Sequence, residues 1–314
     1  MQLYRAVIRP VASFSSQLQS DTLFGTFCWS YKYSCGEEAL GELLQVMKSG
    51  EPPVIFSNAF PSGTVPMPLG IYDKSADLEN IKTKNARKAA YQNRKKLKSA
   101  GYIKREWFER IQRGDSDGFT VGLQSDSIQE QTVIHNMVVR DSGQVENVDG
   151  SGSLYEEDEF YPTRDILYDI YILSSLDAEL LKKTVEMMLL LGIGKNKSTG
   201  KGAFELMDWK EDSFSIQNAN AFMALSNFVP AKNDPTDGRY KILIKYGKLD
   251  REFASEEIPF KKPILFFQAG ALFRTDEVKP FYGKCLEQVS VKREVVTNAY
   301  TIAVPVCLEV ERSS

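Results

Sequence analysis

The stretch GIGKNKSTGKGAF, residues 192–204, decides the fold because it joins two segments whose patterns are clear. The preceding segment, DAELLKKTVEMMLLLG (177–192), has the apolar periodicity of an amphipathic helix and ends on a glycine. The following segment, AFELMDW (203–209), is typical of a strand. A helix, a glycine-rich turn and a strand in this order predict the second half of a β-α-β unit.

Segments further from the turn complete the predicted topology. The expected elements are strands at 3–10, 54–61 and 166–173, and helices at 22–33 and 37–48. Ser20 and Asp21 are the expected N-cap residues of the first helix. Strand, helix, strand, a long insertion, and then strand, helix, strand is the order of a ferredoxin-like (RRM-like) βαββαβ domain. The predicted fold class is therefore α+β.

A domain boundary is expected near residue 217, after the polar segment SIQNANA. The first domain, residues 1–216, would contain an insertion at about 74–162 and the glycine-rich loop at 192–202. The second domain, residues 217–314, is dominated by predicted strands.

Length and composition indicate a folded protein of one large domain or two ordinary ones. The chain has 314 residues, of which 42% are hydrophobic and 26% charged, and its formal net charge is −3. This balance argues against a protein that coats nucleic acid with its whole surface, but it allows a local basic groove.

No apolar run approaches the roughly 20 residues of a membrane span. The N-terminal segment resembles no secretory signal, and the four cysteines form no CxxC pair. We therefore expect a cytoplasmic protein without a disulfide framework, a bound metal or a membrane partner.

Charge is divided unevenly along the chain. Residues 82–113 hold 12 Lys and Arg against two acids, whereas residues 114–180 hold 15 acids against Arg140 and Arg164. Two segments of opposite charge predict either two different partners or one segment folded against the other.

The glycine-rich loop favours a polyanionic ligand. Its spacing does not match a phosphate-binding GxxxxGK[ST] loop, because five residues separate Gly194 from Gly200 and Gly202 stands where the Ser or Thr belongs. It also runs from helix to strand, the reverse of that motif. Glycines nevertheless allow close backbone approach to phosphates, and lysines add charge. The alternative is a flexible connector with solvated lysines.

Two residues and one acidic run each allow a chemical role, in catalysis or metal binding, and a simpler structural one. His135, the single histidine, could be the general base of a metal-independent ribonuclease, but a hydrogen-bonding group near RNA is simpler. Asp21 is more simply a helix-capping residue than a catalytic acid. The acidic run 156–159 cannot point all its side chains inward on a strand, so we expect a solvated face or a basic protein partner rather than a metal site.

Three motifs together resemble one family. The glycine-rich loop resembles the C-terminal glycine-rich loop of the RAMP superfamily of CRISPR-associated RNA-binding proteins. LQSDTLFGTFCW (18–29) is similar to that family's early SDTLFG segment, and HNMVVRDSGQVENVDGSGSLYEEDEFYP (135–162) is similar to its central hairpin. FSNAFP (56–61) narrows the resemblance to the Cas5 group, and within it to the fourth subunits of type III-A Csm effector complexes. The family's Ile-Asp-Arg segment reads Val-Val-Arg here, so Arg140 matches but the family's aspartate is absent.

The resemblance implies a non-catalytic subunit that binds and caps the 5′ repeat-derived handle of the guide crRNA. It implies a degenerate ferredoxin-like second domain, a thumb hairpin within 132–162, and no cofactor. The implied partners are crRNA, the large polymerase-palm subunit and the backbone RAMP subunit, with target RNA nearby. The rival hypothesis is an endoribonuclease that processes precursor crRNA with His135 as general base.

The expected RNA-binding residues come from four segments. They are Ser20 and Thr22; Arg87, Lys88, Arg94 and Lys95; His135, Asn136, Arg140 and Tyr155; and Gly192, Gly194, Lys195, Asn196, Lys197, Ser198, Thr199, Gly200, Lys201 and Gly202.

Overall fold

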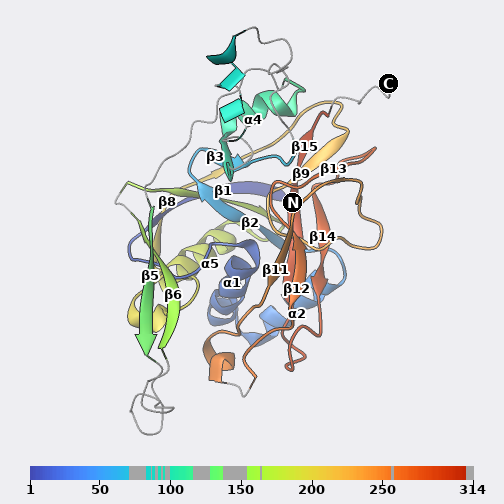
Figure 1. The fold of residues 1–314 in the computed structure, drawn as a ribbon. Helices are drawn as coiled ribbons and strands as arrows, with labels where there is room; N and C mark the ends of the chain where they lie inside the picture. The colour runs from blue at the N-terminus through green and yellow to red at the C-terminus, as the bar shows by residue number, and fades with distance from the viewer. Residues whose placement is uncertain are drawn as a thin grey trace.

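A four-stranded antiparallel sheet forms the centre of the N-terminal half of the structure, a computed structural model (Figure 1). The described residues are 1–70, 83–85, 87–88, 91–92, 95, 100–115, 128–136, 154–162, 165–255 and 258–308. The sheet has the order β2 (Val54–Pro61), β7 (Tyr168–Ser174), β1 (Gln2–Pro10), β8 (Phe204–Glu211). Every neighbouring pair in the sheet is antiparallel. The two inner strands are β7 and β1, and β7 is buried along its whole length.

Helices α1 (Ser20–Cys35) and α5 (Ala178–Leu191) pack together against this sheet, and α2 (Glu37–Lys48) follows α1 directly (Figure 1). Residues four positions apart on α1, such as Leu23, Phe27 and Tyr31, are buried. The side chain of Asp177 caps α5 by accepting hydrogen bonds from the N–H groups of Glu179 and Leu180. The predicted elements of both β-α-β units are therefore confirmed.

The cap of α1 differs from the prediction. Gln19 is the N-cap residue, and no side chain of the helix start caps the helix locally. Instead, the N–H of Ser20 donates to Asn58 Oδ1 on β2 at 3.0 Å. The expectation that Ser20 and Asp21 cap α1 is wrong, because an acceptor remote in sequence takes this position.

The insertion between β2 and β7 contributes short elements and one long hairpin. Strands β3 (Thr64–Pro66) and β4 (Tyr102–Lys104) pair, and α4 (Arg105–Gln112) follows them. Strands β5 (Ile128–Asn136) and β6 (Leu154–Pro162) form a separate two-stranded hairpin. A two-residue bridge between Phe14 and Phe160 joins its base to the body of the protein.

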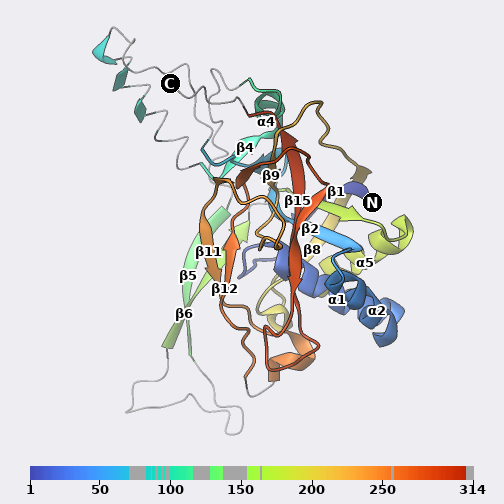
Figure 2. The ribbon, with the colours of Figure 1, turned by 90° about the vertical axis from the view of Figure 1, so that its right-hand side faces the viewer.

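The C-terminal part is rich in strands, as predicted. A five-stranded sheet has the order β10 (Gly238–Arg239), β13 (Leu272–Arg274), β9 (Ala221–Ala224), β15 (Thr297–Val306), β14 (Phe281–Leu286). Strands β11 (Ile242–Lys245) and β12 (Ile264–Phe267) form a separate ribbon (Figure 2). The 3-10 turns η1 (Lys197–Thr199) and η2 (Arg251–Ser255) complete the described elements.

One apolar core continues across the expected boundary at residue 217. The same cluster contains Phe56 and Tyr171 from the first sheet and Met223 and Tyr300 from the second. The hydroxyl of Tyr300 also donates to the carbonyl of Met47 at 2.8 Å. The α+β class is confirmed, while the division into two domains stays a prediction. In the described part of the chain, no helix is both long and apolar enough to cross a membrane.

Candidate nucleic-acid interface

The glycine-rich loop between α5 and β8 folds tightly on itself and on the segment that follows β1. Gly192, Gly194, Gly200 and Gly202 all have positive φ angles, between 74° and 90°. A Cβ atom on Gly202 would lie 2.2 Å from the carbonyl oxygen of Ile193, and one on Gly194 would lie 2.6 Å from Ser16 Cβ. Close packing as well as backbone conformation therefore requires glycine at these two positions.

The middle of the loop has the geometry of an anion-binding nest. Asn196 adopts the left-handed conformation (φ 57°, ψ 27°), and the right-handed turn η1 follows it. Such an alternation turns three successive N–H groups, here those of residues 196–198, toward one point. Within the described residues these three groups have no hydrogen-bond acceptor, whereas the N–H of Lys195 donates to Ser16 Oγ at 3.2 Å.

One face of the β5–β6 hairpin lies against the loop. The pairing of the strands places His135, Tyr155, Glu157 and Glu159 on this face. The side chains of Glu157 and Glu159 are only 9% and 2% exposed, and the other two acids of the run lie on the exposed face. The expected solvated face therefore holds only Glu156 and Asp158, because alternate side chains of a strand point to opposite faces and Glu157 and Glu159 point toward the loop.

The hairpin acids bind the cations of the loop. Lys201 Nζ is hydrogen-bonded to Glu159 Oε1, and both side chains are largely buried. Lys195 Nζ lies 3.5 Å from Glu157 Oε1, and Asn196 Nδ2 donates to Glu157 Oε2 at 2.6 Å. The acids of the hairpin therefore pair with the glycine-rich loop, an arrangement that the charge division between 82–113 and 114–180 did not predict.

Lys197 has a different partner. Its Nζ is hydrogen-bonded to Asp250, which directly precedes η2, and the side chain is 13% exposed. Burial lowers the pKa of Lys197, and the ion pair with Asp250 opposes this effect only in part. Of the three loop lysines, Lys195 alone has an exposed side chain, at 61%.

His135 belongs to the same junction. Its ring stacks on Tyr155, with centroids 5.4 Å apart and an interplanar angle of 23°. Its Nε2 lies 3.6 Å from Glu159 Oε1 and 3.9 Å from Glu157 Oε2. The structure thus brings together the expected residues His135 and Tyr155 and the glycine-rich loop. We call this cluster the loop–hairpin junction, comprising residues 192–202 and the inner face of β5–β6.

Ser20 and Thr22 lie elsewhere. Ser20 is fully buried, and its hydroxyl has no hydrogen-bond partner among the described residues. Thr22 Oγ1 accepts a hydrogen bond from Lys245 Nζ at 3.2 Å, and the same amine bonds Asp21 Oδ1 at 2.5 Å. Thr22 thus contacts β11, while Ser20 is bonded through its N–H to Asn58 of β2.

The basic segment also lies away from the junction. Arg87, Lys88 and Lys95 are exposed and helical, as predicted. The described pieces of this segment, coloured teal, lie beyond α4, at the other end of the ribbon from the β5–β6 hairpin (Figures 1 and 2). Arg94 and Arg140 fall outside the described residues, as do the side chains of Asn136 and Ser198.

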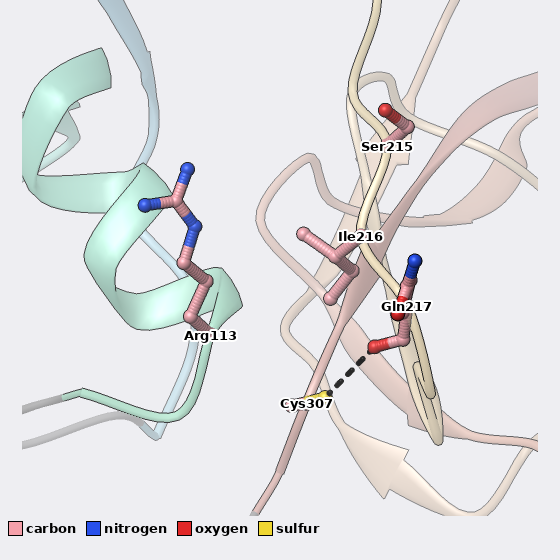
Figure 3. Close-up of a pocket in the computed structure, with 5 residues that line it drawn as sticks. All are labelled: Arg113, Ser215, Ile216, Gln217 and Cys307. Carbon is pink, nitrogen blue, oxygen red and sulfur yellow. Dashed lines mark hydrogen bonds between the residues drawn. The ribbon is translucent and has the colours of Figure 1, made fainter.

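A hollow of about 500 Å³ lies between the end of α4 and the segment near residue 217 (Figure 3). Arg113, Ser215, Ile216, Gln217 and Cys307 line it. The thiol of Cys307 approaches the carbonyl oxygens of Gln217 and Asn218 at 3.8 and 3.1 Å. None of these described lining residues is an acid or a histidine, so they form no carboxylate or histidine acid–base pair. Among the described residues, no three His, Cys, Asp or Glu side chains are grouped to hold a metal.

The structure resembles solved chains over nearly its whole length. A chain in the crystal structure of a Csm1–Csm4 cassette in complex with AMPPNP is 21% identical with a TM-score of 0.63, and the match covers 98% of this chain and 99% of that one. A chain in the same cassette in complex with cA4 is 20% identical with a TM-score of 0.64 and the same coverage. A chain in a Csm3–Csm4 subcomplex of the type III-A CRISPR-Cas interference complex is 18% identical with a TM-score of 0.58, covering 97% and 99%.

Comparisons of sequence alone give no relative. No protein-family model matches the chain, and no curated protein matches it. At 18–21% identity the solved chains establish a shared fold. The fold is therefore the α+β fold of chains found in type III-A Csm assemblies, and the resemblance stated from the three motifs is confirmed at this level.

Sequence reasoning missed the residues that hold the loop in place. Ser16, Glu157, Glu159 and Asp250 all contact it, and none was expected to. The sequence did carry a signal for Glu157 and Glu159, because every second residue of 155–159 lies on one face of a strand. Nothing in the sequence pointed to Asp250.

Proposed function

We propose that this chain is a RAMP-superfamily subunit of a type III-A CRISPR Csm effector complex, of the kind found in Csm1–Csm4 cassettes. The observation that carries this proposal is the match over 97–99% of both chains to subunits of two different Csm assemblies. The proposal includes a ferredoxin-like first domain. The order β2-β7-β1-β8 with two β-α-β units supports it. Residues 217–314 would be the degenerate second domain.

Within the complex, the chain would bind the 5′ handle of the crRNA without cleaving it. The N–H groups of residues 196–198 converge as in an anion-binding nest, and the exposed amine of Lys195 stands beside them. A phosphate seated there would accept hydrogen bonds from the backbone and an ion pair from the lysine. Tyr155, 45% exposed on the adjacent hairpin, offers a ring for an unpaired base.

Lys197 and Lys201 would act indirectly. Both are held by carboxylates and have little exposure, so they fix the shape of the loop instead of meeting phosphate. Partnership with the large subunit and the backbone subunit follows from the same proposal, because the matched assemblies are named for Csm1 and Csm3 together with Csm4.

The test is binding of handle RNA to the complex over a series of salt concentrations. Lys195→Ala should weaken binding several-fold and lower the slope of log K against log salt by about 0.7, the value for one phosphate contact on a single strand. Lys182→Ala removes the same charge from an exposed position on α5 and should change neither. An unchanged slope for Lys195→Ala would contradict a phosphate site at the loop.

The nuclease alternative has a separate test. Incubation with precursor crRNA in the absence of metal should leave the RNA intact. Cleavage that His135→Ala abolishes would replace the non-catalytic proposal by the endoribonuclease hypothesis.

A further inference from the structure

The β11–β12 ribbon has one packed face and one open apolar face. On the packed face, Phe266 is buried and Lys245 bonds Asp21 of α1. The pairing of Ile242 with Phe267 and of Ile244 with Leu265 places the other set of side chains on the opposite face. Phe267, at one end of this second face, packs against Phe228 and Phe273. The side chains further along the face, Ile242, Ile244 and Leu265, are more than half exposed.

The exposure of this face is large for apolar side chains. Six residues of the ribbon and its flanks are between 44% and 70% exposed: Tyr240, Ile242, Ile244, Tyr246, Phe260 and Leu265. Soluble monomers rarely expose contiguous apolar patches of this kind unless the patch is a binding surface. We call these six residues the ribbon patch.

The charges around the ribbon patch have one sign. Residues 239–248 and 258–267 contain six Lys and Arg and no acid. Lys245 is bound to Asp21, and Lys261 donates to the carbonyl of Val296 and to Thr297 Oγ1, each at 2.9 Å. Lys241, Lys248 and Lys262 are exposed, so the edge of the patch is cationic.

We infer that the ribbon patch is the docking surface for another protein subunit, whose matching surface is apolar at its centre and acidic at its rim. The centre of the patch, Ile242, Ile244 and Leu265, is aliphatic and cannot stack on bases, which favours protein over RNA. A second copy of this chain would bring the same cations face to face, which disfavours self-association. The inference rests on the proposed function, because it takes the partner from the same complex.

The experiment measures assembly of the full chain with purified large and backbone subunits of its own Csm complex. Ile244→Lys and Tyr246→Ser should each weaken binding of one subunit by about tenfold or more. Leu190→Lys alters a side chain that is 81% exposed on α5 and should leave assembly unchanged. Circular dichroism and thermal melting of each variant separate loss of docking from loss of folding.

Charge reversal tests the acidic rim. Lys262→Glu should slow association with the same subunit several-fold at low salt, and the difference should vanish at high salt.

Four results would overturn the inference. The first is equal assembly by wild type, Ile244→Lys and Tyr246→Ser. The second is a wild type that self-associates through the patch, seen by analytical ultracentrifugation. The third is a loss of RNA binding, with subunit binding intact, in the patch variants. The fourth is a wild type that binds neither subunit. That result would also remove the proposed complex membership, while the salt series on Lys195→Ala tests RNA binding independently.

Discussion

Replacing Lys201 by methionine would leave a buried carboxylate without its cation. Glu159 is 2% exposed and has three neighbours: Lys201 Nζ, the hydroxyl of Tyr161, which donates at 2.7 Å, and His135 Nε2 at 3.6 Å. Methionine retains most of the length of the lysine side chain and removes the charge. The substitution therefore isolates the ion pair that fixes the hairpin to the glycine-rich loop.

The expected cost is about 2 kcal/mol at neutral pH. Breaking a fully buried pair by removing one partner costs roughly 3–5 kcal/mol. Here the lysine end is 18% exposed, so water enters the vacated space, and the hydrogen bond from Tyr161 remains. Both effects reduce the cost. Because every 1.4 kcal/mol is a factor of ten, about 2 kcal/mol corresponds to roughly thirtyfold in the opening equilibrium of the hairpin.

Hydrogen exchange followed by mass spectrometry measures this opening directly. Peptides from β5 and β6 should exchange about thirtyfold faster in Lys201→Met, while peptides from α5 keep their protection. The double variant Lys201→Met with Glu159→Gln should recover most of the protection, because no charge is then buried without a partner. Protection of β5 and β6 within threefold of wild type in the single variant would refute the reasoning.

Two further predictions concern stability. Gly202→Ala should cost more than about 3 kcal/mol in thermal denaturation, because its Cβ would lie 2.2 Å from a backbone oxygen at φ 74°. Gly200→Ala, with φ 84° but no atom within 4 Å, should cost only about 1–2 kcal/mol. For Asp212, burial raises the pKa, but hydrogen bonds from Arg105 and from the N–H of Ser213 outweigh it, so the pKa is lowered overall. Its ionised form therefore stabilises the fold above the ordinary carboxyl pKa, and this contribution is lost as the pH falls through the lowered value. Wild type should then lose more stability than Asp212→Asn between pH 5 and pH 2, as urea denaturation at each pH would measure; equal losses would contradict the assignment.

Much of the fold could be predicted because its signals are local. The apolar period of 177–192 depends only on which side chains share a face, and this segment forms the helix expected. Strands β3 and β4 were missed because each has three residues and each pairs with a strand remote in sequence. The cap of α1 was misassigned for the same reason, since Asn58 lies on β2.

The sequence predicted the lysines of the candidate site but not which lysine pairs with which carboxylate. Composition identified the loop and its lysines, and the hairpin motif identified His135 and Tyr155. The pairing of Lys197 with Asp250 joins residues 53 positions apart, and that of Lys201 with Glu159 joins residues 42 apart. Periodicity shows which face a side chain occupies but not which remote side chain it meets, so three similar lysines could not be told apart.

The loop lysines differ in burial, and this difference determines which lysine–carboxylate pair an RNA phosphate could break at the junction. The Lys195 pair is exposed at its lysine end and separated by 3.5 Å, so it contributes little and a phosphate could replace the carboxylate at low cost. Glu157 would keep the hydrogen bond from Asn196 Nδ2 after that exchange. The Lys201 pair cannot exchange in this way, because a carboxylate that is 2% exposed would lose its cation. The junction therefore combines an inner ion pair that holds the hairpin on the loop with an outer pair whose lysine is available to an anion.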